Sequence, residues 1–395
     1  MVTIQIERLQ EDDVTTETAH SLVTRIMKTI RTQYQSAKLP EWNPTQCDIY
    51  FEDSMLPDGR PYFLPLIILR TKPCSWLLRS GGCTTCNYQF VAALSDRSVT
   101  DEQIISQTKW ALEKLRPLER YPYIHISSAG SFLDPTEISD QVLVRICQLF
   151  DEAGVQILGF ETRPEYLLNK RRLKLVRDGF SRSFAVGVGL ESVNDFIRNV
   201  CFNKGFEIDL FVKAVQALRD HDMEFFSYVL LGKPFLTVAE DVQDAVETIR
   251  FSLQQGGLAL LMVANLQEYT LTHWLWERNE YKLPKLWAAI RVLEMLEPEE
   301  RMKVAIKAID KAVPPPKAFA ANCPNCTSIV SNAIVGWDLT GDYGLIERVQ
   351  NCCDCKKEWN VEFDSKPVLP LENRVTEALA RMMPEVLARF GETAS

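Results

Sequence analysis

Six short apolar runs alternate with longer amphipathic stretches between about residue 60 and residue 300. The runs are rich in β-branched and aromatic residues, and they begin at Phe63, Tyr123, Val155, Ser183, Glu224 and Leu258. The stretches that follow, such as those from Asp101 and Glu240, carry apolar residues at helical spacing. Because this alternation builds parallel sheets with right-handed crossovers, we expect an α/β fold, either an open doubly wound sheet or a partial barrel. Both arrangements place ligands at the carboxyl ends of the strands.

Shorter segments flank this core on both sides. Before it we expect a helix from His20 to Ser36 and a short strand near Cys47 to Glu52. After it, Pro314, Pro315 and Pro316 predict a stiff linker, and a further helix is expected from about Glu372 to Phe390. The expected parts are an N-terminal extension at 1–60, a core at 61–312 and a C-terminal module at 313–395.

Charge and cysteine content narrow the class of protein. The 53 acids and 44 bases give a net charge of -9, which argues against a non-specific polyanion binder. The sequence has no long apolar run, and its first residues are acidic where a signal peptide needs bases, so we expect a cytoplasmic protein without a membrane segment. In a reducing compartment, its 11 cysteines point to metal binding or catalysis and not to disulfides.

Three cysteines lie in one loop after the first expected strand. Eight residues separate Cys74 from Cys83, and two separate Cys83 from Cys86. Three thiolates can hold a 4Fe-4S cluster while one iron stays free for the amino and carboxylate groups of a ligand. Gly81 and Gly82 allow the loop to wrap closely. The spacing alone also fits a structural zinc site with a distant fourth ligand, or cysteines that are simply buried.

Motifs at the other strand ends carry a family resemblance. They are SSAGSFLDP from Ser127, ETRPE from Glu161, GLES from Gly189, and further on NKGF, LLGKPFLT and NLQEYTLTHWLW. With the cysteine loop, they resemble the radical S-adenosylmethionine superfamily, in particular the archaeosine synthase radical subunit RaSEA, from about Pro61 to the last cysteines. The first cysteine gap is longer than is usual in the superfamily and is similar to that of its elongator catalytic-subunit branch. The resemblance implies a partial (β/α)6 barrel with an N-terminal helical extension.

The resemblance also implies where S-adenosylmethionine binds. The segment whose backbone holds the methionine amino group corresponds to Ser128, Gly130 and Ser131. Glu161 and Arg163 are a neighbouring acid and base suited to the zwitterionic end of the cofactor. Alone, such a pair is usually a weak surface ion pair. Glu191 resembles a carboxylate that binds ribose hydroxyls, and its alternative is an acid that stabilises a helix N-terminus.

A reaction and its partners follow from the same resemblance. A reduced cluster would pass one electron to S-adenosylmethionine, and the resulting 5'-deoxyadenosyl radical would abstract hydrogen from the substrate. That substrate would be a lysine adduct of 7-cyano-7-deazaguanine in tRNA, and cleavage of the C–N bond to the lysine would leave the formamidine of archaeosine. The implied partners are tRNA, the lysine-attaching enzyme ArcS and an electron donor. Lys204 and Lys233 are candidate substrate contacts, with simple solvated lysines as the alternative.

A second group of cysteines lies near the C-terminus. Cys323 with Cys326, and Cys352 with Cys355, form two C-x2-C pairs that are typical of a tetrathiolate zinc site, with Cys353 as the spare thiol. A closed zinc site would stabilise a segment too short to bury a good core, so we expect a zinc-ribbon-like module. An auxiliary iron-sulfur cluster is the alternative, because spacing does not fix the metal.

Two other functions remain open from the sequence. One keeps the same cofactors but acts on another RNA or on a small molecule. The other is a zinc-stabilised RNA-binding or scaffold protein, motivated by the same clustered cysteines.

Overall fold

The computed structural model describes residues 16–33, 43–55, 61–88, 99–128, 130–312 and 314–390 of the 395-residue protein. Its strands form one eight-stranded sheet in which the spatial order is the order along the sequence. Their bounds are β1 (Asp48–Met55), β2 (Pro61–Ile68), β3 (Tyr123–Ser127), β4 (Ile157–Thr162), β5 (Ser183–Glu191), β6 (Glu224–Leu231), β7 (Leu258–Val263) and β8 (Val304–Lys307).

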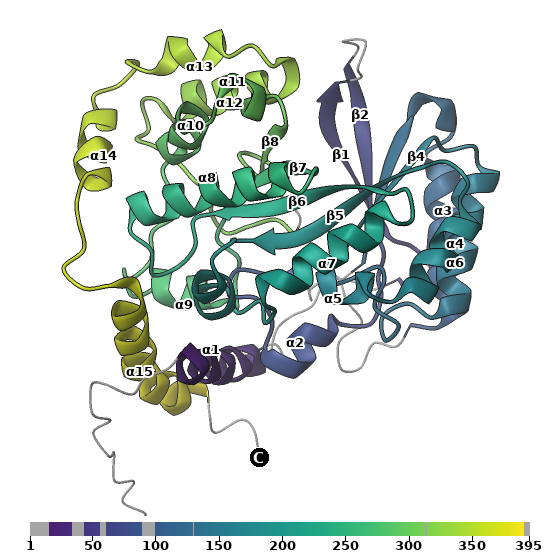
Figure 1. The fold of residues 1–395 in the computed structure, drawn as a ribbon, viewed down its shortest axis with the longest axis horizontal. Coiled ribbons are helices and arrows are strands. Elements are labelled where there is room, and N and C mark those ends of the chain that lie inside the picture. The colour runs from purple at the N-terminus through teal and green to yellow at the C-terminus, as the bar shows by residue number, and fades with distance from the viewer. Residues whose placement is uncertain are drawn as a thin grey trace, which may run out of the picture.

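The winding of this sheet decides between the two expected architectures. Strand β1 pairs antiparallel with β2, and every later pair is parallel. A doubly wound sheet reverses its strand order at a switch point, whereas here each strand lies beside its predecessor. The sheet therefore curls in one direction into a partial barrel (Figure 1). All six expected strands are confirmed, and the short β8 is a further strand that the sequence analysis did not identify.

Helices connect the parallel strands and extend the fold at both ends. Their bounds are α1 (Thr16–Arg31), α2 (Ser75–Ser80), α3 (Asp101–Lys114), α4 (Asp140–Glu152), α5 (Pro164–Leu167), α6 (Lys170–Gly179), α7 (Ile208–Arg219), α8 (Val238–Gln254), α9 (Leu271–Trp276), α10 (Leu286–Met295), α11 (Pro298–Arg301), α12 (Thr327–Thr340), α13 (Gly344–Val349), α14 (Cys355–Phe363) and α15 (Leu371–Phe390). Among the described residues, none of these helices is both long and apolar enough to span a membrane.

Local sequence explains where the two longest crossover helices begin. The Thr100 hydroxyl accepts a hydrogen bond from the Gln103 amide at the start of α3, and the Gln103 side chain accepts one from the Thr100 amide. Thr237 and Glu240 make the same reciprocal pair at the start of α8. Such capping boxes satisfy amides that have no partner within the helix. Both helices were expected from the sequence, and both are confirmed.

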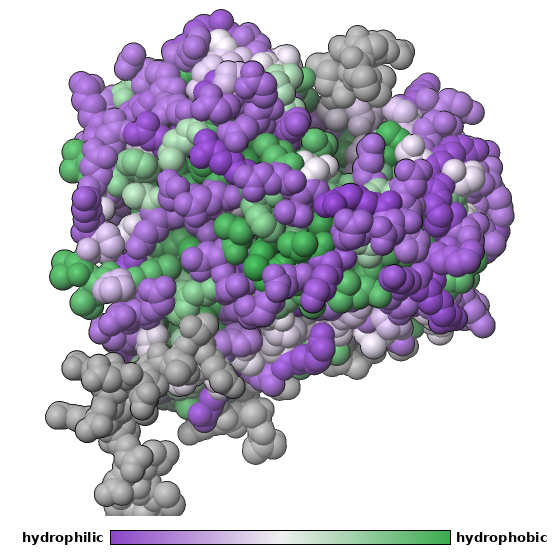
Figure 2. Space-filling view, in the orientation of Figure 1, coloured by the Kyte–Doolittle hydropathy of each residue, from purple (hydrophilic) through white to green (hydrophobic). Residues whose placement is uncertain are grey.

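The alternation of side chains along the strands separates the core from the lumen. Ile124 and Ile126 of β3 are buried in the hydrophobic core with residues of the outer helices. His125 and Ser127, which alternate with them, line the lumen instead. This follows from the period of two along a strand. On the face drawn in Figure 2, mainly hydrophilic side chains cover the outer helices, with hydrophobic residues between them.

The two terminal helices lie side by side beneath the barrel (Figure 1). Apolar residues of α1, including Val23 and Ile26, are buried in one cluster with Val375 and Leu379 of α15. The expected N-terminal helix is confirmed as α1, and the last residues of its predicted range, 34–36, lie outside the described residues. The extension therefore packs against the C-terminal helix as well as the core.

Candidate active site and metal centre

A cavity of about 1000 Å³ occupies the lumen of the partial barrel. Its lining contains most of the residues that the sequence indicated, from segments far apart in the sequence. They are Cys74, Cys83, Cys86, Ser128, Gly130, Glu161, Arg163, Glu191 and Lys204. A single cavity at the carboxyl ends of the strands thus combines soft thiol ligands with buried charges, as a site for a metal cluster and a charged ligand requires.

The cysteine loop is partly helical. Cys74 directly precedes α2, which occupies most of the eight-residue gap before Cys83. Gly81 ends this helix at φ 78°, and a Cβ there would lie 2.5 Å from backbone atoms of Met27 and Lys28 in α1. Glycine is thus required both for the left-handed turn and for the close approach of α1. The long first gap therefore provides a short helix that packs on the N-terminal extension.

The three thiols of this loop fit the demands of a 4Fe-4S cluster. All three are half-buried and line the same cavity. Burial, followed by the nearby Glu137 carboxylate, raises the pKa of Cys74 to about 12. Burial, followed by Cys83, raises the pKa of Cys86 to about 11. Because thiols must lose their protons to bind iron, occupation of this site would be coupled to proton release.

The loop after β3 packs directly against Cys74. A Cβ on Gly130 would lie 2.7 Å from the Cys74 Cβ, so only glycine allows this contact. Glu137 holds the loop from behind, because its carboxylate accepts hydrogen bonds from the Ser131 amide at 2.9 Å and the Ser128 hydroxyl at 3.0 Å. Burial raises the pKa of Glu137 to about 8. The sequence analysis missed this glutamate, and its only signal was an acid shortly after the SSAGSF motif.

Ser131 has a different position from the one expected. It is fully buried and is not among the cavity-lining residues that the structure describes. Its hydroxyl accepts a hydrogen bond from the Arg163 amide at 3.1 Å and so joins the loops after β3 and β4. The Ser131 hydroxyl thus fixes these two loops, and cofactor contact by Ser131 stays an expectation.

Glu161 and Arg163 both line the cavity, but each is bound to other partners. The Glu161 carboxylate accepts hydrogen bonds from the hydroxyls of Ser127 and Tyr228. Burial raises the pKa of Glu161, although these two hydrogen bonds favour its ionised form. Glu161 is thus held by hydroxyls of β3 and β6, whereas Arg163 has other partners. Tyr228 escaped the sequence analysis, although a tyrosine at a lumen position of β6 was a usable signal.

Arg163 directly follows β4 and has its own set of partners. Its Nε donates to Glu165 at 2.5 Å, and its Nη2 donates to the Lys204 carbonyl at 2.6 Å. The guanidinium also lies 4.6 Å from the centre of the Trp76 ring, close enough for a cation–π interaction. Trp76 belongs to α2, so Arg163 connects the end of β4 to the cysteine loop.

Glu191 forms a buried ion pair with Lys204. The Lys204 Nζ lies 2.8 Å from Glu191 Oε1, and both side chains are about nine-tenths buried. Burial disfavours the ammonium of Lys204, but Glu191 and the nearby Cys83 outweigh this effect and raise its pKa. The backbone bend at Glu191, which has φ 66°, ends β5 at this point. Two sequence candidates therefore meet at one place in the cavity.

Lys233, the other lysine candidate, does not reach this cavity. Its side chain is fully buried and lies 3.0 Å from Asp241 and 3.1 Å from Asp244, and its Nζ also donates to the Leu230 carbonyl. It is not among the described residues that line the lumen. Lys233 is therefore held in an internal ion-pair network apart from the lumen, and this position does not support the expected substrate contact.

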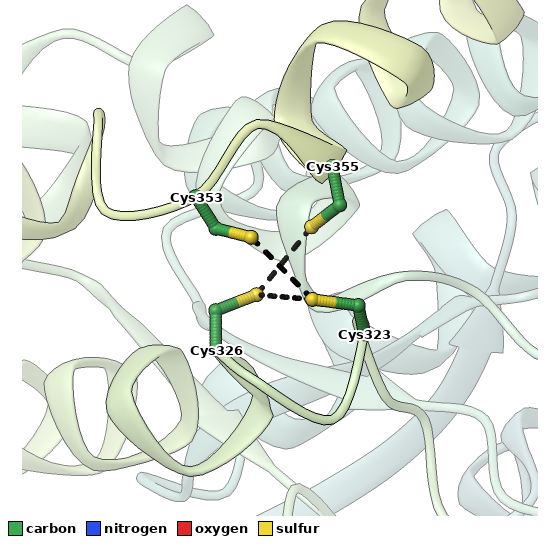
Figure 3. Close-up of side chains that lie close together, drawn as sticks. All are labelled: Cys323, Cys326, Cys353 and Cys355. Atoms are coloured by element: carbon green, nitrogen blue, oxygen red, sulfur yellow. Dashed lines mark hydrogen bonds between the residues drawn. The ribbon is translucent and has the colours of Figure 1, made fainter.

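The C-terminal cysteines form a compact group of four. The sulfur atoms of Cys323, Cys326, Cys353 and Cys355 all lie within 4.8 Å of one another, and their side chains point toward a common centre (Figure 3). The Trp287 indole donates a hydrogen bond to the Cys355 sulfur at 3.4 Å. Four converging sulfurs fit a tetrahedral metal ion.

One expected ligand of this group is corrected. Cys352 is exposed and lies outside the group, and Cys353, expected to be the spare thiol, takes its place. The Cys352 amide still bonds to the Val349 carbonyl at the end of α13, whereas the Cys353 carbonyl accepts a bond from Lys356 in the first turn of α14. The turn between the two helices thus turns Cys353 inward. The segment between the two cysteine pairs is helical and includes α12 and α13.

Comparisons with known proteins support the family resemblance. No family model matches the sequence. It is 27% identical to archaeosine synthase subunit beta of Methanosarcina acetivorans, over 78% of this chain and 85% of that protein. It is 28% identical to archaeosine synthase subunit beta of Thermococcus kodakarensis, over 77% of this chain and 93% of that protein. Among solved structures, the archaeal Elp3 protein of Methanocaldococcus infernus aligns over 60% of this chain and 59% of its own, with 18% identity and a TM-score of 0.44. The chain is thus similar to archaeosine synthase subunit beta over most of its length.

Proposed function

We propose that this protein is a lyase of tRNA modification that cleaves the lysine C–N bond of a 7-deazaguanine-lysine adduct and forms the formamidine of archaeosine. One observation carries the proposal: three thiols of one loop face the same cavity as Glu161 and the Glu191–Lys204 pair. The names of the relatives supply the substrate class. In this proposal the partners are tRNA, the lysine-attaching ArcS and an electron donor, and the setting is the cytoplasm.

The cavity residues have separate roles in the proposal. Cys74, Cys83 and Cys86 hold a 4Fe-4S cluster, which supplies one-electron reductive cleavage of S-adenosylmethionine when it is bound. The backbone at Gly130 lies against Cys74, and Ser128 lines the same cavity, so we assign both to the amino-acid end of the cofactor. Glu161 and Arg163 contribute charge at the same end.

The buried ion pair serves the other end of the cofactor and the substrate. Lys204 orients the Glu191 carboxylate, so that its second oxygen is available to ribose hydroxyls. Lys204 itself lines the cavity and is the substrate contact that we retain. Because both groups are largely buried, their charges act in a low-dielectric setting and are weakly screened by salt.

The four C-terminal cysteines complete the proposed cofactor set. We assign Cys323, Cys326, Cys353 and Cys355 to a structural zinc ion, because a closed tetrathiolate site leaves no position for substrate. In this scheme residues 1–60 are an extension, 61–312 are the catalytic core and 313–395 carry the zinc module.

Anaerobic reconstitution tests the proposed reaction. The reconstituted protein is incubated with reductant, S-adenosylmethionine and lysine-modified tRNA, and both 5'-deoxyadenosine and the nucleoside products are measured by mass spectrometry. We expect formamidine formation that depends on the modified tRNA. If 5'-deoxyadenosine appears without the formamidine product, the radical chemistry stands and the archaeosine assignment is wrong.

Single cysteine variants test the proposed cluster ligands. Alanine at Cys74, Cys83 or Cys86 should remove the iron and abolish 5'-deoxyadenosine formation, while the C-terminal metal persists. Cys352→Ala is the matched control, because it removes a thiol that belongs to neither group of cysteines. Iron retained in all three loop variants would contradict the ligand assignment.

A further inference from the structure

A single arginine of the N-terminal extension reaches the backbone of the cysteine loop. Arg31 is the last residue of α1 and is 9% exposed. Its Nε donates to the Gly81 carbonyl at 2.9 Å, and its Nη2 donates to the carbonyls of Cys83 at 3.0 Å and Cys86 at 2.7 Å. Its Nη1 donates to the Tyr269 carbonyl at 2.7 Å. One guanidinium therefore binds three carbonyls of the loop and ties them to the segment after β7.

The chemistry of the guanidinium suits this task. It presents five N–H donors in a fixed plane and stays charged at every physiological pH, whereas a lysine ammonium is a point charge with three donors. Bonds from an ionised donor are stronger than neutral ones. Two of the bonded carbonyls belong to proposed cluster ligands, so the position of Arg31 bears directly on where their thiols lie.

A second residue holds the same loop from the core side. Asn203 is fully buried, and its Nδ2 donates to the carbonyls of Ser80 at 3.1 Å and Gly82 at 2.8 Å. Arg31 and Asn203 thus bind alternate carbonyls along the segment from Ser80 to Cys86. The loop is fixed along its length, and not only at its two ends.

The packing of α1 holds Arg31 in place. The helix buries Val23, Ile26, Met27 and Ile30 completely against neighbours that include α15, so its last turn cannot move without exposing apolar surface. The role of the N-terminal extension was not readable from the sequence. In the structure, α1 lies beside α2 of the cysteine loop (Figure 1), and its last residue, Arg31, bonds to the carbonyls of that loop.

We propose that Arg31 is a positioning residue that sets the cysteine loop in the shape needed to take up and retain the iron-sulfur cluster. This inference rests on the proposed function only in that Cys74, Cys83 and Cys86 bind the cluster. It requires nothing of the tRNA substrate. Arg31 acts through the loop carbonyls and through its positive charge beside the thiolates, and it takes no part in bond cleavage.

Cluster retention tests the proposal without any assay of turnover. The full-length wild type and the variants Arg31→Gln and Arg31→Lys are reconstituted anaerobically, and iron per protein is measured together with the rate at which a chelator bleaches the cluster absorbance. We expect Arg31→Gln to lose the cluster at least tenfold faster than the wild type. Arg31→Lys should be intermediate, because an ammonium cannot bond to all four carbonyls. Arg25→Gln, at an exposed arginine of the same helix, should behave as the wild type.

A destabilised control separates positioning from general loss of fold. Val23→Ala opens a cavity in the packing of α1 but leaves Arg31 intact. If Val23→Ala accelerates cluster loss as much as Arg31→Gln at equal thermal stability, the specific role of Arg31 is overturned. Wild-type retention in Arg31→Gln would overturn it as well, while leaving the cluster assignment intact. A wild-type protein that takes up no iron would overturn the proposed function together with this inference.

Discussion

Tyr228 of β6 donates a hydrogen bond of 2.9 Å to Glu161 of β4 across the strand that lies between them. The bond is possible because β5 presents Gly187 opposite Glu161, and a Cβ there would lie 2.8 Å from the Tyr228 ring. Because Gly187 has no side chain, residues of the two strands beside β5 can contact each other. The result is a half-buried carboxylate that two hydroxyls, from Ser127 and Tyr228, orient inside the lumen.

Glu161 variants should weaken binding of S-adenosylmethionine. We expect Glu161→Gln to raise the dissociation constant about tenfold or more, because a charge-assisted hydrogen bond contributes about 1.5–3 kcal/mol. Tyr228→Phe should have a smaller effect in the same direction, because it removes one orienting donor. Equilibrium dialysis on cluster-loaded protein measures both. Tyr121→Phe, which lies outside the described cavity lining, is the control. Unchanged binding by Glu161→Gln would remove Glu161 from the site.

Adjacent cysteines give a matched test of the C-terminal metal site. Cys353→Ala should lose the metal, because its sulfur is one of the four that converge. Cys352→Ala should retain about one zinc ion per protein, as a closed site does. Metal analysis after purification without chelators measures both. The reverse outcome, with metal lost only in Cys352→Ala, would restore the ligand set predicted from the two C-x2-C pairs.

Gly205 should tolerate no side chain. Its φ is 72°, and a Cβ would lie 2.0 Å from the Trp76 ring, so Gly205→Ala combines backbone strain with a steric clash. Gly154 has φ 78°, and a Cβ added there would meet no neighbouring atom within 4 Å. Gly154→Ala therefore measures the backbone strain alone. We expect Gly154→Ala to lower the free energy of unfolding by about 1–2 kcal/mol. Gly205→Ala should lower it by about 1–3 kcal/mol more, because of the clash.

Urea unfolding of the two glycine variants provides the comparison. Because Trp76 stacks with Arg163 and donates to the Asn203 carbonyl at 2.6 Å, the clash should also disturb the cysteine loop. Gly205→Ala should therefore lose iron faster than Gly154→Ala. Equal stability of the two variants would show that Trp76 moves aside without cost.

His125 should make the fold sensitive to acid. Burial lowers its pKa from the usual 6.5 to about 4, and its Nδ1 lies 3.1 Å from the Tyr123 hydroxyl. The unfolded state takes up a proton at higher pH than the folded state. The contribution of neutral His125 to the free energy of unfolding is therefore complete above pH 6.5. It is lost as the pH falls toward 4, by an amount on the order of 3 kcal/mol.

The variant His125→Asn checks this pH dependence. Asparagine keeps a group that can bond to Tyr123 but does not titrate, so its free energy of unfolding should fall less between pH 6.5 and pH 4. Urea titrations at both pH values give the difference, and all other titrating groups are common to the two proteins. Parallel curves for the wild type and the variant would exclude His125 as the source.

Local patterns in the sequence were sufficient to locate most strands of the sheet and the loop that carries Cys74, Cys83 and Cys86. Period-two runs located six strands, and the three cysteines followed the first of them as expected. These features depend on neighbours within a few residues. The short β8 gave too little pattern to be identified, because its four residues acquire their pairing only from β7.

The sequence did not show which residues far apart along the chain contact one another. Lys204 and Lys233 were equivalent candidates in the sequence, yet one lines the lumen and the other neutralises two buried aspartates. Ser128 and Ser131 were also equivalent candidates, yet Ser128 lines the lumen and Ser131 joins two loops. Which of these groups meets a ligand depends on how separate strands and helices pack.

The sequence by itself determined the α/β class, the approximate positions of six strands and the two groups of cysteines, because each depends on local periodicity and spacing. The order of the strands, and with it the partial barrel, came from the tertiary structure. Only the tertiary structure decided that Cys353 and not Cys352 joins the second group, and that Arg31 lies behind the first. The physical reason is the same in both cases. A turn between helices sets the direction of one thiol, and the packing of α1 brings a guanidinium to carbonyls that lie 50 to 55 residues away in the sequence.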